Sequence, residues 1–109
     1  MSSISVSDYR THFQEFVEEV AKRPSMYVRN LAELQLLLLG YEAAFRAVVG
    51  GHSDAFFHRQ FSDWLMLKKG WSLAGGWATA MAEAHPSFKL SELIEEFRHL
   101  LSQFVKEKW

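Results

Sequence analysis

The chain has no cysteine, and its 109 residues include only two prolines and six glycines. Without cysteine there is no disulfide framework, no cysteine-ligated zinc and no cysteine nucleophile. A basic excess is also missing, since 12 Lys and Arg residues face 13 Asp and Glu residues. Proteins that bind nucleic acids usually need surplus positive charge to neutralise phosphates. We therefore expect no nucleic-acid partner.

β-branched residues are few, with seven Val, two Ile and two Thr. Leu, Ala, Glu, Lys and Arg dominate instead, and these residues favour helices over strands. A chain of this length has the commonest size of one domain, and 49% of its residues are hydrophobic. We predict an all-α fold, a single-domain helical bundle over residues 1–109 with four long helices and one short helix. Residues 1–6 are expected to form a flexible N-terminal segment.

A hydrophobic run of the kind that crosses a membrane is absent from the sequence. The most apolar stretch, residues 31–49, contains Glu33, Gln35, Glu42 and Arg46, and charged side chains at such depths are costly in a bilayer. The first ten residues lack the cationic and apolar regions of a signal peptide. We expect a cytoplasmic protein without a membrane partner.

Capping residues and prolines place the boundaries of the first two helices. Ser7 is expected to cap the first helix, which ends before Pro24 because the residue before a proline is pushed out of the α region. Asn30, with an acidic residue three positions later, forms a capping-box pattern for the second helix. A pair of glycines at 50–51 is expected to end that helix.

Three further helices are expected in the second half of the chain. Ser53 is positioned to cap the third helix, which Gly70 closes after two lysines. A short alanine-rich helix covers residues 77–84, and Ser91 is expected to cap the last helix. The apolar side of these helices holds most of the aromatic residues, which we interpret as core. Together with the aromatic residues on the apolar side of the first helix, the predicted core aromatics are Phe13, Phe16, Phe57, Phe61, Trp64, Phe97 and Phe104.

The second helix is apolar on nearly all sides. Gln35, Glu42 and Arg46 line up in one narrow polar stripe, in which Glu42 and Arg46 have the spacing of a surface ion pair. Gly40 and Ala44 lie on the opposite side, and a glycine in mid-helix costs about 1 kcal/mol relative to alanine. We therefore predict that another helix approaches closely at Gly40 and Ala44. On this model, Gly40→Leu should destabilise the fold by about 1–3 kcal/mol through overpacking.

No catalytic or metal-binding pattern emerges from the sequence. Two histidines that chelate one metal from a helix need a spacing such as HxxxH or HExxH, which is absent. Nor is there a Ser-His-Asp order, a phosphate-binding glycine loop or a Rossmann or Walker pattern. We predict a non-enzymatic protein with no catalytic residues, no metal site and no cofactor. The histidines considered are His12, His52, His58, His85 and His99.

One enzymatic alternative stays open at Arg46 and His52. Their spacing falls within the Arg-x5-His pattern of HEPN ribonucleases, which are also small and all-α. The glycines between the two residues break the helix that should carry both, and Arg46 has a nearer partner in Glu42. The simpler interpretation is that Arg46 forms a surface ion pair with Glu42 and that His52 is a histidine in a loop. A helical adaptor or homodimer is a further alternative.

Two patterns resemble known families. The segment KRPSMYV at 22–28 resembles the RPxMY segment of the gyrase-type ATPase domain, but no glycine-rich ATP lid follows and the chain is too short for that domain's sheet. A wider pattern over residues 9–104 adds Gly40-Tyr41, FxxWL at 61–65 and Gly76-Trp77. It resembles small helical immunity proteins encoded beside bacterial polymorphic toxins of contact-dependent and type VI secretion systems. This resemblance implies a protein that binds and blocks one cognate toxin domain.

A toxin domain that acts on nucleic acid would present a basic cleft, and an inhibitor of it should present carboxylates. The most acidic contiguous face lies on the first helix, where Lys22 is the single positive charge among the acidic residues. The second candidate lies on the last helix, with Glu92, Glu95 and Glu96. We predict that the toxin contacts the first-helix carboxylates, which are Asp8, Glu15, Glu18 and Glu19.

Overall fold

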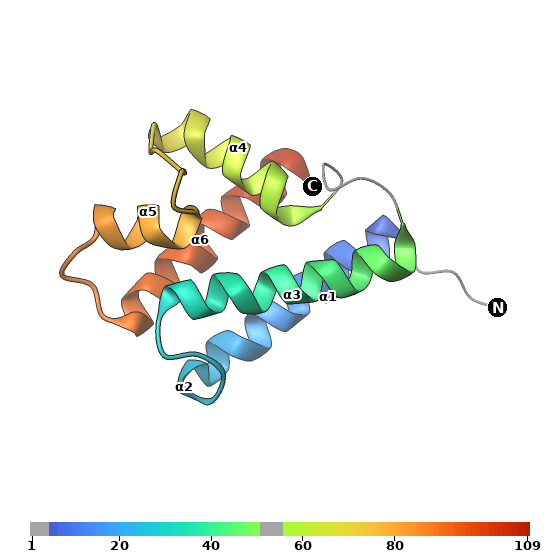
Figure 1. Cartoon of the computed structure of the whole chain (residues 1–109), viewed down its shortest axis with the longest axis horizontal. Coiled ribbons are helices and arrows are strands. Elements are labelled where there is room, and N and C mark those ends of the chain that lie inside the picture. The colour runs from blue at the N-terminus through green and yellow to red at the C-terminus, as the bar shows by residue number, and fades with distance from the viewer. Residues whose placement is uncertain (1–4, 51–55) are drawn as a thin grey trace.

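The computed structural model describes residues 5–50 and 56–109, which form six helices and no strand (Figure 1). The all-α prediction is therefore confirmed. A sixth helix of a single turn, α2 (Pro24–Tyr27), was not predicted, and it has a proline at its first position, where the fixed φ of proline suits a helix start. The four long helices and the short one are α1 (Val6–Lys22), α3 (Leu31–Val49), α4 (Phe57–Lys69), α5 (Trp77–Ala84) and α6 (Leu90–Lys108).

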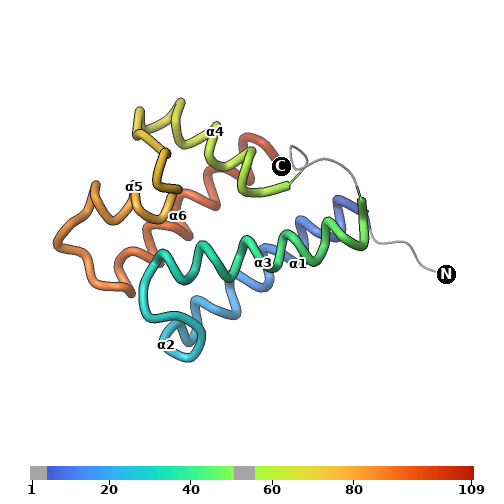
Figure 2. Tube along the Cα trace, in the orientation of Figure 1, coloured from blue at the N-terminus to red at the C-terminus, as the bar shows by residue number. Residues whose placement is uncertain are grey.

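The helices are arranged around α6 and a hairpin of α1 and α3. The tube in Figure 2 shows α1 and α3 running side by side in opposite directions, with α2 at the bend. The ring of Phe16 on α1 stacks on Tyr41 of α3, with centroids 4.5 Å apart. The last helix, α6, packs against α1, α3 and α4, and α5 packs against α3. Within the described residues, no helix has the length and hydropathy needed to cross a membrane.

The core is a continuous aromatic cluster centred on Phe57, the first residue of α4. The ring of Phe57 lies 4.4 Å from that of Phe13 and 4.6 Å from that of Phe61, centroid to centroid. Trp77 of α5 stacks on Phe97 of α6 at 4.6 Å. The predicted core aromatics are confirmed, with one qualification: Phe16 is only half-buried. The fully buried members are Phe13, Phe57, Phe61, Trp64, Phe97 and Phe104.

Two predicted N-caps are wrong. Ser5, not Ser7, caps α1, because its hydroxyl accepts the N–H of Asp8 at 3.1 Å while the Asp8 carboxylate accepts the N–H of Ser5 at 2.9 Å. The N–H and the hydroxyl of Ser5 both donate to the Asp8 carboxylate, and these two hydrogen bonds hold the pKa of Asp8 below its ordinary value. The predicted flexible segment is therefore too long, since Ser5 and Val6 belong to the start of α1. Ser91 lies inside α6, which begins at Leu90.

The remaining boundaries follow local signals that were read correctly. Asn30 accepts the N–H of Glu33 at 2.8 Å and caps α3. Gly50 and Gly70 end α3 and α4 with φ of 79° and 69°, in the left-handed region that glycine adopts without steric cost. The predicted cap Ser53 lies outside the described residues, and α4 begins at Phe57.

The second predicted helix, α3, packs in the reverse of the expected orientation. Gly40 and Ala44 are exposed, and a Cβ atom at Gly40 would meet nothing within 4 Å. The predicted close approach of another helix is therefore wrong, and so is the overpacking expected of Gly40→Leu. Gln35 and Glu42 on the other side of α3 face α5 and α4 instead. Those two helices need hydrogen-bond acceptors at their N-termini, which α3 supplies.

Candidate functional site

The four acidic residues predicted as a contact surface all lie exposed on α1. One of them, Glu18, bridges to α6. Its carboxylate accepts hydrogen bonds from Nη2 and Nε of Arg98, at 2.6 and 3.1 Å. Nη1 of Arg98 also donates to Glu95 at 2.7 Å. The first and second candidate surfaces of the sequence analysis are thus joined through Arg98.

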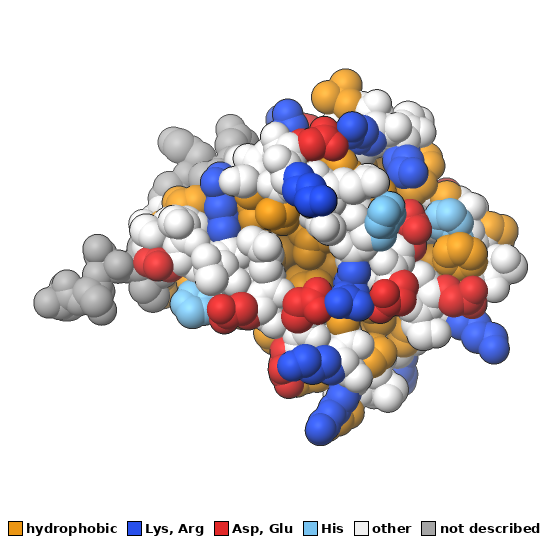
Figure 3. Space-filling view, turned by 180° about the vertical axis from the view of Figure 1, so that it is seen from behind, with side chains coloured by type: hydrophobic (Ala, Val, Ile, Leu, Met, Phe, Trp, Pro, Cys, Tyr) orange, Lys and Arg blue, Asp and Glu red, His pale blue; other side chains and the backbone are white. Residues whose placement is uncertain are grey.

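We call the combined surface the acidic face. Seen from behind the view of Figure 1, a row of acidic side chains crosses this side of the molecule with a basic side chain among them (Figure 3). The net charge of the chain is only −1, but seven of its 13 acidic residues gather here. Uneven charge of this kind steers charged partners during association. The acidic face consists of Asp8, Glu15, Glu18, Glu19, Glu92, Glu95 and Glu96.

Cations within reach of these carboxylates leave the face acidic. Nζ of Lys22 lies 3.7 Å from Glu19, and Nδ1 of His12, a cation only when the ring is protonated, lies 3.5 Å from Glu15. Such exposed pairs contribute about 0–1 kcal/mol each, so a partner can displace them at little cost. Arg98 is held more firmly, and the hydrogen bonds to Glu18 and Glu95 raise its pKa above the ordinary value. It therefore stays charged and fixes the seam between α1 and α6.

Two hollows lie on the acidic face, and one of them has walls suited to basic side chains. A hollow of about 390 Å³ at the start of α6 is lined by Phe88 and Ser91 together with Glu92, Glu95 and Glu96. A second hollow of about 310 Å³ lies between α1 and α6, and its wall holds one carboxylate, Glu18, with two cations, Arg98 and Lys106. Carboxylates around an apolar floor match the charged head and apolar stem of Lys or Arg. The hollow at the start of α6 has this chemistry, whereas the cations of the second hollow oppose it.

A second polar cluster, which sequence reasoning missed, is buried between α3 and α4. The side chain of Glu42 is 6% exposed and accepts the backbone N–H of His58 at 3.0 Å, with Nδ1 of His58 at 3.2 Å. On the exposed side, Nη1 of Arg46 lies 3.9 Å from Oε2 of Glu42. Burial raises the pKa of Glu42, but hydrogen bonds from His58 and the nearby charges outweigh burial and lower it. The predicted ion pair between Glu42 and Arg46 is therefore present, but its expected place on the surface is wrong for Glu42, which is buried.

The buried polar residues serve as N-caps for two other helices. The residue before α4 is Phe56, which has no acceptor, and the first two N–H groups of α4 bond instead to Tyr9 Oη at 3.3 Å and to Glu42. Gly76 precedes α5 and likewise has no side-chain acceptor, so Gln35 Oε1 accepts the N–H of Ala78 at 2.9 Å. Burial raises the pKa of Tyr9, which keeps its phenol neutral. The sequence signal for this role was the position of Glu42 in the middle of a nearly apolar helix.

The chemistry available to Glu42 and His58 is limited by burial. A carboxylate at Nδ1 orients an imidazole so that Nε2 is the basic atom, as in acid–base catalysis. Here Nε2 of His58 is buried and meets no hydrogen-bond partner among the described residues, so a substrate cannot reach it in this conformation. Across residues 5–50 and 56–109, no group of three His, Cys, Asp or Glu side chains gathers to hold a metal ion.

The residues of the ribonuclease alternative are not brought together in the described part of the chain. Arg46 lies on α3, which ends at Val49, and its closest acidic partner there is Glu42. His52 lies outside the described residues. The predicted break between the two residues is confirmed, because Gly50 terminates the helix before His52.

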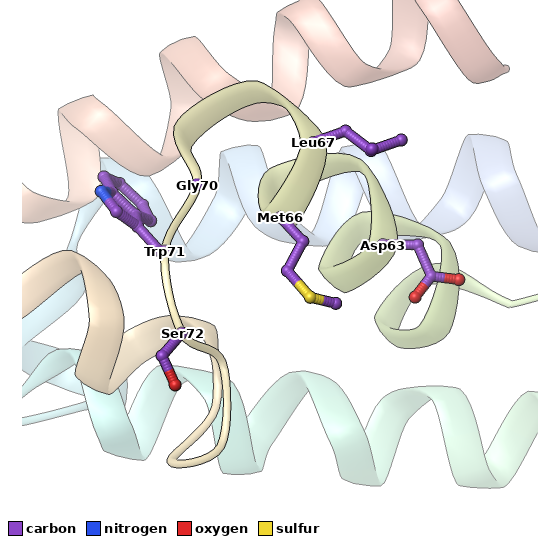
Figure 4. Close-up of a pocket in the computed structure, with 6 residues that line it drawn as sticks. All are labelled: Asp63, Met66, Leu67, Gly70, Trp71 and Ser72. Carbon is purple, nitrogen blue, oxygen red and sulfur yellow. The ribbon is translucent and has the colours of Figure 1, made fainter.

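A further hollow of about 590 Å³ lies at the C-terminal end of α4, where the chain turns toward α5 (Figure 4). Figure 4 shows the labelled side chains diverging: Met66 and Ser72 point to one side, and Trp71 and Leu67 point away from each other. Its single carboxylate, Asp63, is paired with Arg59 at 3.3 Å. A small-molecule site needs several convergent polar groups, and this hollow lacks them.

The comparisons with known proteins assign no family to the chain. No protein-family model, no curated protein and no solved structure matches it.

Proposed function

We propose that this protein is a non-enzymatic binding module: a cytoplasmic immunity protein that binds and neutralises one cognate bacterial toxin domain. The acidic face is the observation that carries the proposal. It unites the carboxylates of α1 with those of α6 on one side of a chain whose net charge is only −1.

The acidic face fits the surface that a nucleic-acid-cleaving or nucleic-acid-modifying toxin presents. Such a domain needs Lys and Arg around its substrate channel to bind phosphates. A protein that covers the channel with carboxylates competes directly for those cations. Opposite charges also speed the encounter of the two proteins, which matters for an inhibitor that must act before damage occurs.

Arg98 contributes preorganisation to this surface. Its three hydrogen bonds to Glu18 and Glu95 hold the carboxylates of α1 and α6 in a fixed relation before a partner arrives. Groups that are already ordered lose less entropy on binding. The resemblance of residues 9–104 to immunity proteins supports the same function from the sequence.

Co-expression with a toxin is the experiment that tests the function. The toxin domain encoded beside the gene for this chain is expressed in a bacterium, with and without the chain. Growth that stops with the toxin alone and recovers with the chain supports the proposal. A toxin that kills equally well in both strains, or a gene with no toxin gene beside it, contradicts it.

A charge-reversal pair then tests the acidic face. Glu15→Lys/Glu19→Lys changes two exposed acidic residues and leaves the Arg98 bridge intact, so we expect the fold to be unaffected. Asp63→Lys/Glu83→Lys makes the same change of charge away from the face and serves as the control. Stopped-flow association at low salt should be slower and less salt-dependent for the first variant only. Equal association rates for both variants would place the contact elsewhere.

A further inference from the structure

The most exposed positions of α3 hold apolar residues from Ala32 to Val48, although the side chains of Glu33 and Arg46 are partly exposed on the same helix. Surface helices normally show charged residues to solvent, but each of these most exposed positions holds an apolar residue or glycine. Leu36 and Val48 are each 67% exposed. Contiguous exposed apolar surface of this kind marks an interaction site. We call this surface the outer face of α3; it consists of Ala32, Leu36, Gly40, Ala43, Ala44, Ala47 and Val48.

The outer face has small side chains in its middle and larger side chains at both ends. Leu36 and Val48 are 12 residues apart, which is about 18 Å along an α-helix. Gly40 and Ala44 lie between them, and the space beside Gly40 is open. Small residues let the axes of two helices come close, and larger side chains on either side then pack around the crossing point. The shape therefore fits another helix.

We propose that the outer face of α3 binds the same face of a second copy of this chain, with the two α3 helices antiparallel. In a two-fold symmetric contact, a surface meets itself, so any charge in the patch faces an identical charge. The acidic face would repel its own copy, whereas the outer face brings no charges together. The antiparallel arrangement opposes the two helix dipoles and keeps Glu33 away from its copy. Leu36 of one chain then lies near Val48 of the other.

The outer face is small for a protein interface, which is typical of weak and transient contacts. From Ala32 to Val48 it extends about 24 Å and is one helix wide, roughly 10 Å. This strip is smaller than the roughly 800 Å² that each partner buries in a standard interface. The dimer is therefore reversible and depends on protein concentration. It shares no residue with the acidic face, so its existence does not depend on the proposed toxin binding.

Sedimentation equilibrium from roughly 5 µM to roughly 500 µM tests the pairing, because this range covers the dissociation constants of weak, transient complexes. The parent should shift from monomer to dimer as its concentration rises. Ala44→Lys places two like charges at the closest point and should weaken the dimer by about tenfold or more. Ala84→Lys makes the same change at an exposed residue of α5 and should dimerise like the parent. A parent that stays monomeric, or an Ala44→Lys variant with the parent's dissociation constant, overturns the proposal.

Gly40→Leu separates the dimer from the fold. Because the space beside Gly40 is open, leucine should leave the melting temperature of the dilute monomer unchanged or raise it. The same leucine fills the crossing point between two copies and should abolish the dimer at concentrations where the parent forms it. Dimerisation of Gly40→Leu at the parent's concentration contradicts the proposed interface.

Engineered cysteines test the orientation of the two helices. The chain has no cysteine of its own, so each crosslink comes from an introduced residue. A mixture of Leu36→Cys protein and Val48→Cys protein should give disulfide-linked dimers that contain one chain of each kind. Leu36→Cys protein alone should not crosslink, because the antiparallel arrangement places its two sulfur atoms about 18 Å apart. Crosslinking of Leu36→Cys to itself, without the mixed product, overturns the antiparallel pairing.

Discussion

Replacement of Glu42 tests the role of α3 as a source of N-caps. In the parent, the carboxylate accepts the N–H of His58 at 3.0 Å, in a position where the side chain of Glu42 is 6% exposed. Glu42→Ala removes this acceptor and leaves the start of α4 without it, whereas Glu42→Gln keeps an oxygen in place but removes the charge. Glu83→Ala, at an exposed position of α5, is the control for loss of a carboxylate.

The expected loss follows from the groups left unpaired. A hydrogen bond to a charged acceptor contributes about 1.5–3 kcal/mol, and loss of an N-cap typically costs about 1 kcal/mol. Burying a carboxylate is itself unfavourable, so removal of the buried charge offsets part of the lost stability. We expect Glu42→Ala to lower the free energy of unfolding by about 2–4 kcal/mol, and Glu42→Gln by about 1 kcal/mol. For a chain of this size, the larger loss corresponds to a fall of roughly 10–20 °C in melting temperature.

The effect should depend on pH. The folded state holds the pKa of Glu42 below its ordinary value of 4.5. The ionised carboxylate therefore stabilises the fold fully above about pH 4.5, and this contribution is lost as the pH falls through the lowered pKa. The difference in unfolding free energy between the parent and Glu42→Gln should accordingly shrink on acidification. A difference that grows below pH 4.5 would contradict the assigned direction.

Urea unfolding followed by circular dichroism measures the stabilities, and amide hydrogen exchange locates the effect. Exchange at His58 should accelerate more in Glu42→Ala than exchange at amides in the middle of α6. If Glu42→Ala unfolds at the same urea concentration as Glu83→Ala, Glu42 does not hold the start of α4.

Two other substitutions test neighbouring contacts. Gly76→Ala should lower the unfolding free energy by about 1–3 kcal/mol, because Gly76 has φ of 91° and the new Cβ would lie 2.5 Å from Gln35 Nε2. Thermal melting checks this expectation. A melting temperature equal to the parent's would contradict it. Trp109→Ala should cost about 2–4 kcal/mol, because the indole packs on Tyr9, Phe13, Phe57 and Phe104 and donates to Gln60 at 2.8 Å. Chemical denaturation measures that loss, and an unchanged midpoint would show that the last residue is peripheral.

Helix boundaries were predictable where the signal is local. Asn30 and Gly70 act within a few residues of the ends they cap, so their roles follow from the sequence alone. Ser5 and Ser7 are both suitable caps by type, and only Ser5 has Asp8 three positions later, a capping-box pattern that decides between them. The correct choice was therefore available in the sequence at α1.

The orientation of α3 was not predictable from periodicity. Its apolar residues surround the helix, so periodicity gives little sense of which side is buried, and the polar stripe looked like the solvent side. The partners that turn this stripe inward are distant in the sequence: Glu42 bonds to His58, and Gln35 bonds to Ala78. The acidic face could not be predicted as one surface for the same reason, because Glu18 and Arg98 are 80 residues apart. The carboxylates of α1 were identifiable in the sequence, but their union with those of α6 was not.

The borrowed caps also bear on the order in which the chain folds. Isolated helices shorter than roughly 12–15 residues are marginal in water, and α4 and α5 have 13 and 8 residues. Neither has a side-chain cap next to it in the chain, and the acceptors they use belong to Tyr9, Gln35 and Glu42. The hairpin of α1 and α3 must therefore assemble before α4 and α5 gain their full stability. The stability of α4 and α5 in this way depends on residues in the N-terminal half of the chain.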